Sequence, residues 1–303
     1  MPLVSVVLPT HNRPQSVVRA AASVLGQGFE ELELIVVDDG SAVPAEQALK
    51  QLRDHRMRIL RSDMPLGPAR ARNLGLEVAT GSWIAFQDDD DEWLAEKLER
   101  QVAVGEQAPP DVGLVYCSFW MEYRDGRRII GGRDTERPSG AVHLELLRGN
   151  FVALPTVMIR REALERVGRF DPALPCFEDW ELFIRLAAHY RFEHVPEPMV
   201  VAYDTPQSIN KSSSSLRVAA LERILEKHGE AIASEPAIHA DFLFHVAHHR
   251  CLGGEFDRGR KMFGKSLRVQ RSWRAAMTLA AANLGPGTYR TLARFYEKLR
   301  SHD

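Results

Sequence analysis

The sequence has few of the features that mark a secreted, membrane-spanning or zinc-binding protein. Its three cysteines, Cys117, Cys176 and Cys251, are widely spaced and odd in number, which indicates neither a disulfide framework nor a zinc site. No segment approaches the roughly 20 apolar residues needed to span a bilayer. The N-terminal residues carry no basic leader. We therefore expect a cytoplasmic protein in a reducing compartment.

The net charge is also close to zero, since the 303 residues include 39 Lys and Arg and 41 Asp and Glu. A balance of −2 gives no global field that favours nucleic acid, so no nucleic-acid partner is expected. The balance nevertheless conceals an asymmetry. Residues 1–210 carry 23 basic and 32 acidic side chains, whereas residues 211–303 carry 16 and 9. The basic C-terminal part could contact an anionic membrane surface, a charged acceptor or an acidic patch of another subunit, or could simply be a solvated face.

The first half of the chain alternates strand and helix patterns. Continuous apolar runs predict strands at Leu3–Leu8, Leu34–Val37, Met57–Leu60 and Trp83–Phe86. Because these runs do not alternate with polar residues, they favour strands buried on both faces of a mainly parallel sheet. Helical patterns lie between or after them, at Pro14–Leu25, Ala45–Arg53, Pro68–Ala79 and Glu92–Val104. This part therefore predicts an α/β fold.

The second half is less regular and then becomes helical. Strands are predicted at Val112–Cys117, Val157–Ile159, Phe192–Val195 and Met199–Tyr203, with a hairpin turn at Asp125–Gly126 and a helix at Glu178–His189. A polar, serine-rich loop is expected at Gln207–Ser215, and helices follow from Leu216. We expect two domains, an α/β domain over residues 1–210 and a C-terminal α-helical extension over residues 211–303.

Polar segments follow the first two predicted strands. In open α/β sheets, ligands lie beyond the carboxyl ends of the strands, where helix N-termini favour anions. Thr10 and Asn12 follow the first strand, where they could equally cap the next helix. Asp38 and Asp39 end the second strand and could accept hydrogen bonds from a base or a ribose. The alternative is an ordinary Asp-Gly turn, with Ser41 capping the following helix.

A run of acids, Asp88–Glu92, follows the fourth predicted strand. Asp88 and Asp90 lie two positions apart on an extended segment, so they project to the same side. Carboxylates are hard oxygen ligands that suit magnesium or manganese, which a diphosphate would also help to bind. The alternative is that the acids interact with the positive end of the next helix, for about 0.3–1 kcal/mol each. That alternative suits Asp91 and Glu92 better than the preceding aspartates.

A second acidic pair, Glu178 and Asp179, begins a predicted helix. Neighbouring helical residues point about 100° apart, so one carboxylate could act as a base while the other anchors a loop. An ordinary acidic helix start is the alternative. Other catalytic patterns are absent from the sequence, including G-x-G-x-x-G after the first strand, the Walker A loop and G-x-S-x-G. His245 and His249 lack the glutamate of H-E-x-x-H, so we interpret them as packing or surface residues.

Taken in order, these segments resemble the nonprocessive, inverting glycosyltransferases of family 2, which have the GT-A fold. The resemblance spans residues 3 to about 203 and is carried by VSVVLPTHNR (Val4–Arg13), IVVDDGS (Ile35–Ser41), GPARARNLGLEVATGSWIAFQDDDDEW (Gly67–Trp93), FEDWELFIRL (Phe177–Leu186) and the acceptor-side stretch from Thr156 to Asp171. One departure stands out: where such sequences often continue with an arginine and a histidine near the diphosphate, Val201–Gln207 has neither. The loop at Gln207–Ser215 could still close over a donor.

The resemblance implies the following site. The base is Asp179, and a divalent metal, Mn or Mg, is bound by Asp90 together with Asp88. Residues near the nucleotide-sugar donor are Pro9, Thr10, Arg13, Asp38, Asp39, Arg72, Asn73, Asp88 and Asp89. Asp89 stands where such sequences often have serine, so it could change the metal preference or face water. Residues on the acceptor side are Glu178, Trp180 and Thr156.

The function implied is inverting transfer of a sugar from a nucleoside-diphosphate donor, with UDP favoured, to an acceptor hydroxyl. The acceptor would be a carbohydrate or a glycolipid in the synthesis of cell-surface polysaccharide, with the protein cytoplasmic or peripheral at the inner face of the membrane. Two alternatives remain open. The aspartates could serve a metal-dependent nucleotidyltransferase, although no basic clamp for a third phosphate is evident near Asp88. A noncatalytic nucleotide-sugar-binding module is the other.

Overall fold

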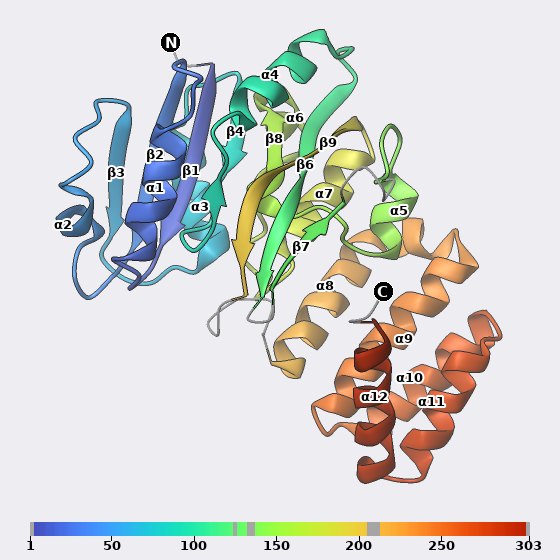
Figure 1. Ribbon diagram of the computed structural model, residues 1–303. Helices are drawn as coiled ribbons and strands as arrows, with labels where there is room; N and C mark the ends of the chain where they lie inside the picture. The colour runs from blue at the N-terminus through green and yellow to red at the C-terminus, as the bar shows by residue number, and fades with distance from the viewer. Residues whose placement is uncertain (1–2, 124–125, 132–136, 205–212, 301–303) are drawn as a thin grey trace. The chain divides into compact units, whose positions relative to one another are not determined.

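A computed structural model describes residues 3–123, 126–131, 137–204 and 213–300, with side chains up to residue 293 (Figure 1). The chain forms two compact units. The first, called the α/β unit, comprises Met1–Pro172 and Glu178–Gln207. The second, called the helical unit, comprises Ala173–Phe177 and Ser208–Asp303.

The α/β unit is built on a mixed sheet with strand order β3-β2-β1-β4-β8-β6-β9-β5, and β7 pairs with β6 (Figure 1). The strands are β1 (Val4–Thr10), β2 (Leu32–Asp39), β3 (Met57–Ser62), β4 (Trp83–Phe86), β5 (Glu92–Trp93), β6 (Val112–Tyr123), β7 (Gly126–Ile130), β8 (Val157–Arg160) and β9 (Arg191–Tyr203). Strands β1 to β4 are parallel, as the continuous apolar runs predict. Beyond them, β8 runs antiparallel to both β4 and β6, while β9 is parallel to β6. The predicted α/β class is confirmed, and beyond β4 the sheet is mixed, with both antiparallel and parallel pairs.

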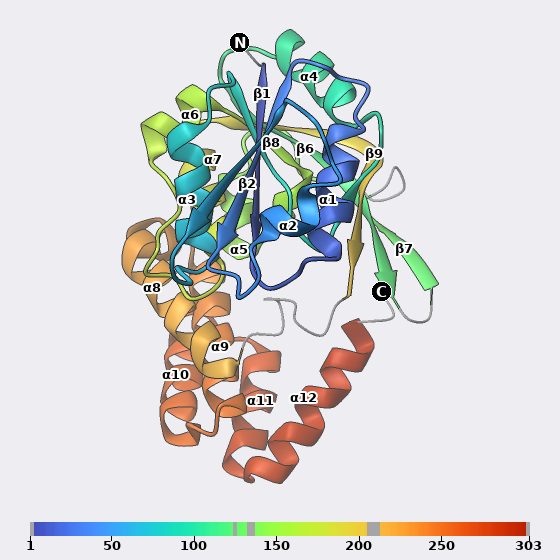
Figure 2. The same cartoon turned by 90° about the vertical axis from the view of Figure 1, so that its left-hand side faces the viewer.

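Helices cover both faces of this sheet. They are α1 (Ser16–Leu25), α2 (Ala45–Leu49), α3 (Pro68–Val78), α4 (Lys97–Gln107), α5 (His143–Arg148), α6 (Arg161–Val167) and α7 (Glu178–Ala187), with a 3₁₀ turn η1 (Leu154–Thr156). Val6 and Leu8 of β1 join the apolar cluster that α1 and α2 cover. Val7 faces the other side, where a Cβ on Gly75 of α3 would lie 2.4 Å from its Cγ1. Glycine thus permits α3 to approach the strand closely, and Figure 2 shows α3 and α1 on opposite faces of the sheet.

Two predicted elements differ from the structure. The helix expected at Glu92–Val104 begins only at Lys97, because Glu92 and Trp93 pair with Val201 and Val200 of β9. The indole of Trp93 is buried there, and its Nε1 donates to the Pro155 carbonyl at 3.0 Å. The break expected around Pro196–Pro198 is also wrong. Strand β9 continues through these prolines, and its pairing with β6 accommodates them by register shifts around Ser118.

The hairpin predicted near Gly126 is present, since β6 and β7 pair antiparallel with Tyr123 opposite Gly126. Asp125 itself lies outside the described residues, as does most of the loop expected at Gln207–Ser215.

The helical unit contains α8 (Ser214–Ala233), α9 (Pro236–Leu252), α10 (Phe256–Val269), α11 (Trp273–Asn283) and α12 (Pro286–Arg300). Its core includes Phe244, Cys251, Phe263 and Tyr289, drawn from α9, α10 and α12. His249 is partly buried, which lowers its pKa to about 3, and His248 Nδ1 lies 2.7 Å from the Tyr289 hydroxyl oxygen. None of the helices within the described residues is both long and apolar enough to cross a membrane.

Candidate functional site

The polar segments after β1 and β4 meet at the carboxyl edge of the parallel strands. Thr10 Oγ1 donates to Asp89 Oδ2 at 2.7 Å, and Arg13 Nη1 donates to Asp89 Oδ1 at 2.7 Å. The same nitrogen of Arg13 lies 2.8 Å from Asp90 Oδ2. Two segments that are 76 positions or more apart in sequence are therefore joined by charge-assisted hydrogen bonds. The convergence follows from the parallel arrangement, which brings strand ends to one edge.

Asp89 is enclosed by these contacts and does not face water, since only 7% of its surface is exposed. Burial raises its pKa to about 6, and the nearby charge of Asp90 adds to the effect, whereas Arg13 and Thr10 oppose it. Both carboxylate oxygens already accept hydrogen bonds from the chain. Asp89 therefore stabilises the loop after β4 from a buried position.

Asp38 and Asp39 make different contacts at the end of β2. Asp38 is buried and accepts the backbone N–H groups of Ser41 and Ala45, as well as Nη1 of Arg61 at 2.5 Å. Burial alone would raise the pKa of Asp38, but the hydrogen bonds with Ser41, the Ala45 amide and the Arg61 charge lower it. The side chain therefore stabilises the start of α2. The expectation that Ser41 caps this helix is wrong, because α2 has Pro44 at its N-cap and the Ser41 hydroxyl accepts the Asn12 N–H at 2.9 Å.

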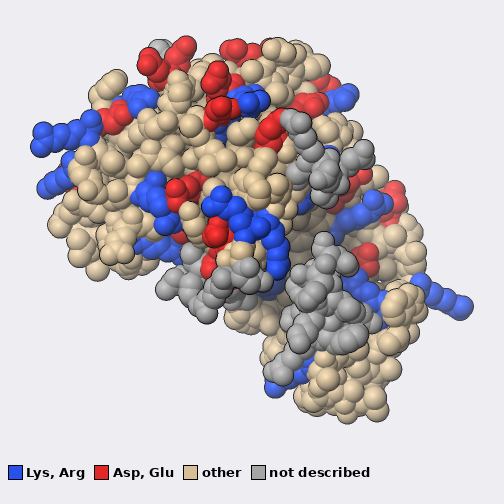
Figure 3. Space-filling view, viewed as in Figure 1, with Lys and Arg blue, Asp and Glu red and all other residues tan. Residues whose placement is uncertain are grey.

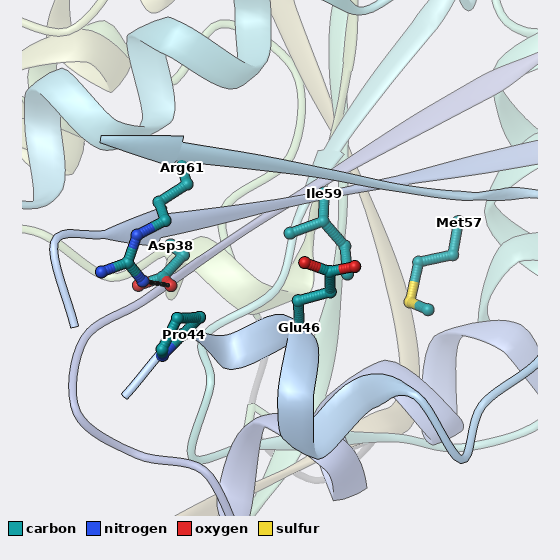
Figure 4. Close-up of a pocket in the computed structure, with 6 residues that line it drawn as sticks. All are labelled: Asp38, Pro44, Glu46, Met57, Ile59 and Arg61. Atoms are coloured by element: carbon teal, nitrogen blue, oxygen red, sulfur yellow. Dashed lines mark hydrogen bonds and ion pairs between the residues drawn. The ribbon is translucent and has the colours of Figure 1, made fainter. Parts of the chain in front are cut away.

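Asp39 connects β2 to the segment before α3. Its two carboxylate oxygens accept the N–H groups of Leu66 and Gly67 at 2.7 and 2.9 Å. Gly67 has a φ of +88°, a conformation that glycine adopts with little strain. Next to Asp38, a cavity of about 390 Å³ opens between α2 and the strands β2 and β3, lined by Asp38, Pro44, Glu46, Met57, Ile59 and Arg61 (Figure 4).

Arg72 of α3 connects the acidic run Asp88–Glu92 to the acidic pair Glu178 and Asp179. Its side chain is 5% exposed, Nη1 donates to Glu178 Oε1 at 2.6 Å, and Nη2 donates to Asp88 Oδ1 at 2.8 Å. The guanidinium also lies 5.7 Å from the centre of the Phe170 ring. A planar guanidinium with several fixed donors can bind two carboxylates at once, which a lysine ammonium does less rigidly. Arg72 therefore sets the position of Asp88 relative to the start of α7.

The neighbouring Asn73 is engaged by the backbone. Its Nδ2 donates to the Phe170 carbonyl at 2.9 Å, and its Oδ1 accepts the Phe170 N–H at 3.1 Å. This pairing holds the Phe170 ring, which makes an edge contact with Phe86 at a centroid distance of 5.2 Å. Asn73 thus acts through Phe170 in the structure, and its amide is not directed to the aspartate loop.

Asp179 is the carboxyl whose surroundings best suit a proton acceptor. Burial raises its pKa to about 7, and the charge of Glu178 adds to the effect. Its Oδ1 accepts the Trp180 N–H at 2.7 Å, and Nδ2 of Asn150 lies 3.4 Å from Oδ2. A base works best when its pKa lies near the operating pH, so this shift favours proton transfer near neutrality. Asn150, in the loop after α5, belongs to no motif that the sequence could reveal.

The three residues expected on the acceptor side are enclosed. Trp180 is 6% exposed and its Nε1 donates to the Leu146 carbonyl, which ties α7 to α5. Thr156 is 1% exposed and its hydroxyl donates to the Ala153 carbonyl within η1. Glu178 is 4% exposed and binds Arg72. In the structure these side chains hold the surrounding elements in place.

A network that the sequence did not reveal supports the aspartate loop from the side of α1. Arg19 donates from Nη2 to the Asp90 carbonyl at 2.9 Å, and its Nε lies 2.9 Å from Glu92 Oε1. The guanidinium lies 4.4 Å from the centre of the Tyr203 ring. Tyr203 in turn donates from its hydroxyl to Glu92 and from its N–H to Asp91 Oδ1. The end of β9 is thereby joined to the loop.

The carboxylates fit a divalent metal only with help from a ligand. Among the described residues, no group of three or more His, Cys, Asp or Glu side chains could hold a metal ion. Asp88 and Asp90 are the accessible acids of the loop, with 32% and 17% of their side chains exposed. Burial raises the pKa of Asp88, and Asp90 adds to this despite Arg72, which indicates excess negative charge. Magnesium is commonly bound by one or two carboxylates together with substrate phosphates, and this donor set matches that pattern.

The fold and this site define a class, the GT-A proteins, in which acidic loops gather at the carboxyl edge of an α/β sheet. The chain belongs to glycosyl transferase family 2, whose sequence profile matches residues 5–168, more than half of its length. It is thus a member of an enzyme family of glycosyltransferases.

Two curated relatives from Escherichia coli illustrate this membership. The chain is 30% identical over 162 residues to "UDP-Glc:alpha-D-GlcNAc-diphosphoundecaprenol beta-1,3-glucosyltransferase WfgD", a match covering 54% of this chain and 62% of that protein. It is 26% identical over 297 residues to the "Putative colanic acid biosynthesis glycosyl transferase WcaA" of strain K12, covering 94% and 95%. The matches to the first two curated relatives span slightly less than two thirds of their length, 65% and 62%.

Two solved structures share the fold. S. aureus TarS 1-349 in complex with UDP-GlcNAc matches with a TM-score of 0.70 at 19% identity, covering 98% of this chain and 92% of that one. The mannosyltransferase PcManGT from Pyrobaculum calidifontis, in complex with GDP-Man and Mn²⁺, matches with a TM-score of 0.58 at 20% identity, covering 93% and 80%.

Proposed function

We propose that the α/β unit binds a nucleoside-diphosphate sugar and transfers the sugar to an acceptor hydroxyl with inversion at the anomeric carbon. The observation that carries this proposal is the bridge made by Arg72, which joins Asp88 of the first acidic motif to Glu178, the neighbour of Asp179. In a family 2 chain, this bridge holds the start of α7, which carries Asp179 next to Glu178, beside the aspartate loop that follows β4.

The donor is proposed to be a UDP-sugar. The name of WfgD specifies UDP-Glc, and TarS was solved with UDP-GlcNAc. PcManGT was solved with GDP-Man, so a nucleoside diphosphate is common to all three. The residues proposed to surround it are those at the ends of β1, β2 and β4, with Pro9, Thr10 and Arg13 on the first, Asp38 and Asp39 on the second, and Asp88 and Asp89 on the third, next to Arg72 and Asn73.

Asp90 and Asp88 would hold magnesium or manganese when the donor supplies its phosphate oxygens. The bound metal would act as a Lewis acid that stabilises the charge developing on the diphosphate. In that arrangement Arg13, which lies 2.8 Å from Asp90, would keep the carboxylate oriented. PcManGT, which shares the fold, was solved with Mn²⁺, and this supports the assignment.

Asp179 is proposed to act as the base. It takes the proton of the acceptor hydroxyl as that oxygen bonds to the anomeric carbon, while the bond from that carbon to the diphosphate oxygen breaks. The leaving nucleoside diphosphate carries away the electron pair of the broken bond. A single displacement from the opposite face inverts the configuration, and the raised pKa of Asp179 suits proton acceptance near pH 7.

The acceptor is proposed to be a carbohydrate or glycolipid used in cell-surface polysaccharide synthesis, at the cytoplasmic side of the membrane. Two printed names support this. WfgD acts on a diphosphoundecaprenol-linked sugar, and WcaA is assigned to colanic acid biosynthesis. Because this chain matches only part of WfgD, the acceptor class is carried over as a proposal and not as an identity.

Calorimetry with a panel of nucleoside-diphosphate sugars, each with and without Mn²⁺ or Mg²⁺, tests the proposal. We expect metal-dependent binding of at least one donor. In the absence of an acceptor, slow transfer of the sugar to water should release the nucleoside diphosphate. Tight binding of a nucleoside triphosphate without binding of any donor would indicate a nucleotidyltransferase instead. Donor binding with no turnover under any condition, even with candidate acceptors, would indicate a noncatalytic module.

A further inference from the structure

Helix α11 of the helical unit exposes an apolar ridge. Trp273, Met277 and Leu284 are 71%, 48% and 75% exposed. At about 100° per residue, these positions fall within about 40° of one another around the helix axis. Leu284 is the C-cap residue and keeps helical dihedrals, so it continues the same line. The opposite side of the helix, with Ala275 and Ala282, is buried against the unit's own core.

This ridge differs from the scattered apolar residues that any protein surface carries. Its members share one helix face, and one of them is a tryptophan with 71% of its surface exposed. The residues of α11 between them on that face are Ala276 and Ala280, so no charge interrupts the line. Arg274 is the one charged residue in the helix.

The sequence around the ridge contains cations without any acid. No Asp or Glu occurs between Asp257 and Glu297. Exposed cations lie on α10 just before the ridge, where Lys261, Lys265 and Arg268 fall within about 60° on one helix face, and Arg271 stands two positions before Trp273. Arg290 follows the ridge on α12. In Figure 3 the lower margin of the helical unit is largely uncharged, with Lys and Arg to either side of it.

We propose that the apolar ridge of α11 and the cations beside it form a docking surface for an anionic lipid bilayer. A tryptophan and long apolar side chains enter the boundary between headgroups and acyl chains, while Lys and Arg interact with the lipid phosphates. The absence of acids over this stretch gives the surface one sign of charge, which complements an anionic membrane. The helix lies in the interface and does not cross it, consistent with the lack of a spanning helix among the described residues.

Flotation of the full chain with lipid vesicles tests this inference, which goes beyond the proposed transferase activity and does not depend on it. One set of vesicles contains phosphatidylglycerol mixed with phosphatidylcholine, and the other contains phosphatidylcholine alone. We expect binding to the first set and much weaker binding to the second. Raising the salt from about 0.05 M to about 0.5 M shortens the Debye length from about 14 to about 4 Å and should release most of the protein.

Two sets of variants separate the apolar and the charged contributions. Trp273→Ser alone, and Trp273→Ser with Met277→Ser and Leu284→Ser, should lower vesicle binding at least tenfold. Lys265→Glu, Arg268→Glu and Arg271→Glu should each lower it about thirtyfold, because reversing a cation that contributes about 1 kcal/mol near an anionic surface removes that attraction and adds a repulsion of similar size. The matched controls are Leu216→Ser, an exposed apolar residue on α8, and Lys50→Glu in the α/β unit, neither of which should change binding.

The outcomes decide the proposal. Since Trp273 is 71% exposed, its single replacement should leave the circular dichroism and melting temperature unchanged, which keeps the test valid if the triple variant does not fold. Equal binding by the Trp273→Ser variant, or no binding to phosphatidylglycerol vesicles at low salt, would overturn it. So would loss of a concentration-dependent dimer in the same variant without any vesicle binding, which would assign the ridge to a second copy of the chain.

Discussion

Arg72 Nη1 donates to Glu178 Oε1 at 2.6 Å, although the two residues are 106 positions apart. Both side chains are about 95% buried, and the second amino group of Arg72 binds Asp88. A buried ion pair gains little net stability, because desolvation offsets most of the attraction. Its value lies in geometry: the single guanidinium sets the distance between the aspartate loop after β4 and the acidic start of α7.

Removing Arg72 should destabilise the α/β unit strongly. The Arg72→Ala variant leaves Glu178 buried without its cation, a change that costs about 3–5 kcal/mol in unfolding free energy. Urea unfolding monitored by circular dichroism measures it. The exposed pair of Arg100 and Glu96 provides the control, and Arg100→Ala should leave the urea midpoint unchanged within error, because solvent screens an exposed ion pair.

A double-mutant cycle separates loss of the pair from loss of packing. Arg72→Met combined with Glu178→Gln removes both charges, so it should recover much of the stability lost in Arg72→Met alone. If the double variant is as unstable as the sum of the two single variants, the two side chains are energetically independent and the bridge does not couple the motifs.

Replacing Asp179 should separate binding from chemistry. Asp179→Asn keeps the size of the side chain and its acceptor oxygen but cannot take a proton, so transfer should fall by about 10² to 10⁴. Donor affinity measured by calorimetry should remain within about twofold of the wild type, since Asp179 is not proposed to contact the diphosphate. Asn150→Ala, which removes only the neighbour at 3.4 Å, should have a smaller effect. Normal transfer by Asp179→Asn would make the base assignment wrong.

The raised pKa of Asp179 also predicts a pH dependence of activity. Because the base must be ionised, kcat/KM should rise with pH and level off above about 7, near the pKa of the folded carboxyl. The residual activity of Asp179→Asn should lack this limb. A flat profile for the wild type between pH 5 and 8 would contradict the assignment.

The same shift affects stability with a definite sign. An unfolded aspartate has a pKa near 3.9, whereas burial raises that of folded Asp179 to about 7. The folded state therefore favours the protonated carboxyl. This contribution is fully present below about pH 3.9 and is lost as the pH rises to about 7. Asp179→Asn should thus gain stability relative to the wild type between pH 5 and 7.5, which urea titrations at the two values would measure.

Much of the fold was predictable because strands β1, β2 and β4 carry local apolar patterns. The predicted burial of β3 on both faces is wrong, since its residues are only partly buried or exposed. The apolar runs of β1, β2 and β4 are continuous, and they are buried on both faces as that pattern indicates. Glu92 and Trp93 show the opposite case. Their sequence matches a helix start, but they pair with Val201 and Val200, which lie 109 and 107 positions further on, and local patterns carry no information about such a partner.

The candidate site divides in the same way. The meeting of Thr10 with the loop at Asp89 follows from parallel strands ending at one edge, so the sequence could predict their proximity. The partners of Arg72 could not be predicted, since one lies 16 positions away and the other 106. Arg19 belongs to no sequence motif either, because its role depends on the position beside the loop that α1 gives it.

Removing the carboxylate of Asp90 should weaken donor binding only where metal takes part. We expect Asp90→Ala to lower affinity for the donor at least tenfold in the presence of Mn²⁺ and to change little in its absence. The two protein carboxylates of the proposed site would then be reduced to Asp88 alone. Asp63→Ala, an exposed acid of the same unit, is the matched control. Equal loss with and without metal would assign Asp90 to the fold of the loop instead of to the metal.

Arg19 should act as a positioning residue for the same loop. It holds the Asp90 carbonyl at 2.9 Å and Glu92 at 2.9 Å, yet its side chain makes no contact with Asp88 or Asp179 among the described residues. Arg19→Ala should therefore raise the KM for the donor and the metal concentration at half-maximal rate several-fold, with a smaller change in kcat. Arg19→Lys should restore part of the effect, because an ammonium can still donate to the carbonyl, although it lacks the planar fork that also binds Glu92. If kcat falls while KM and metal dependence stay constant, Arg19 does not position the loop for the donor, and its contacts with Glu92 and Tyr203 serve stability alone.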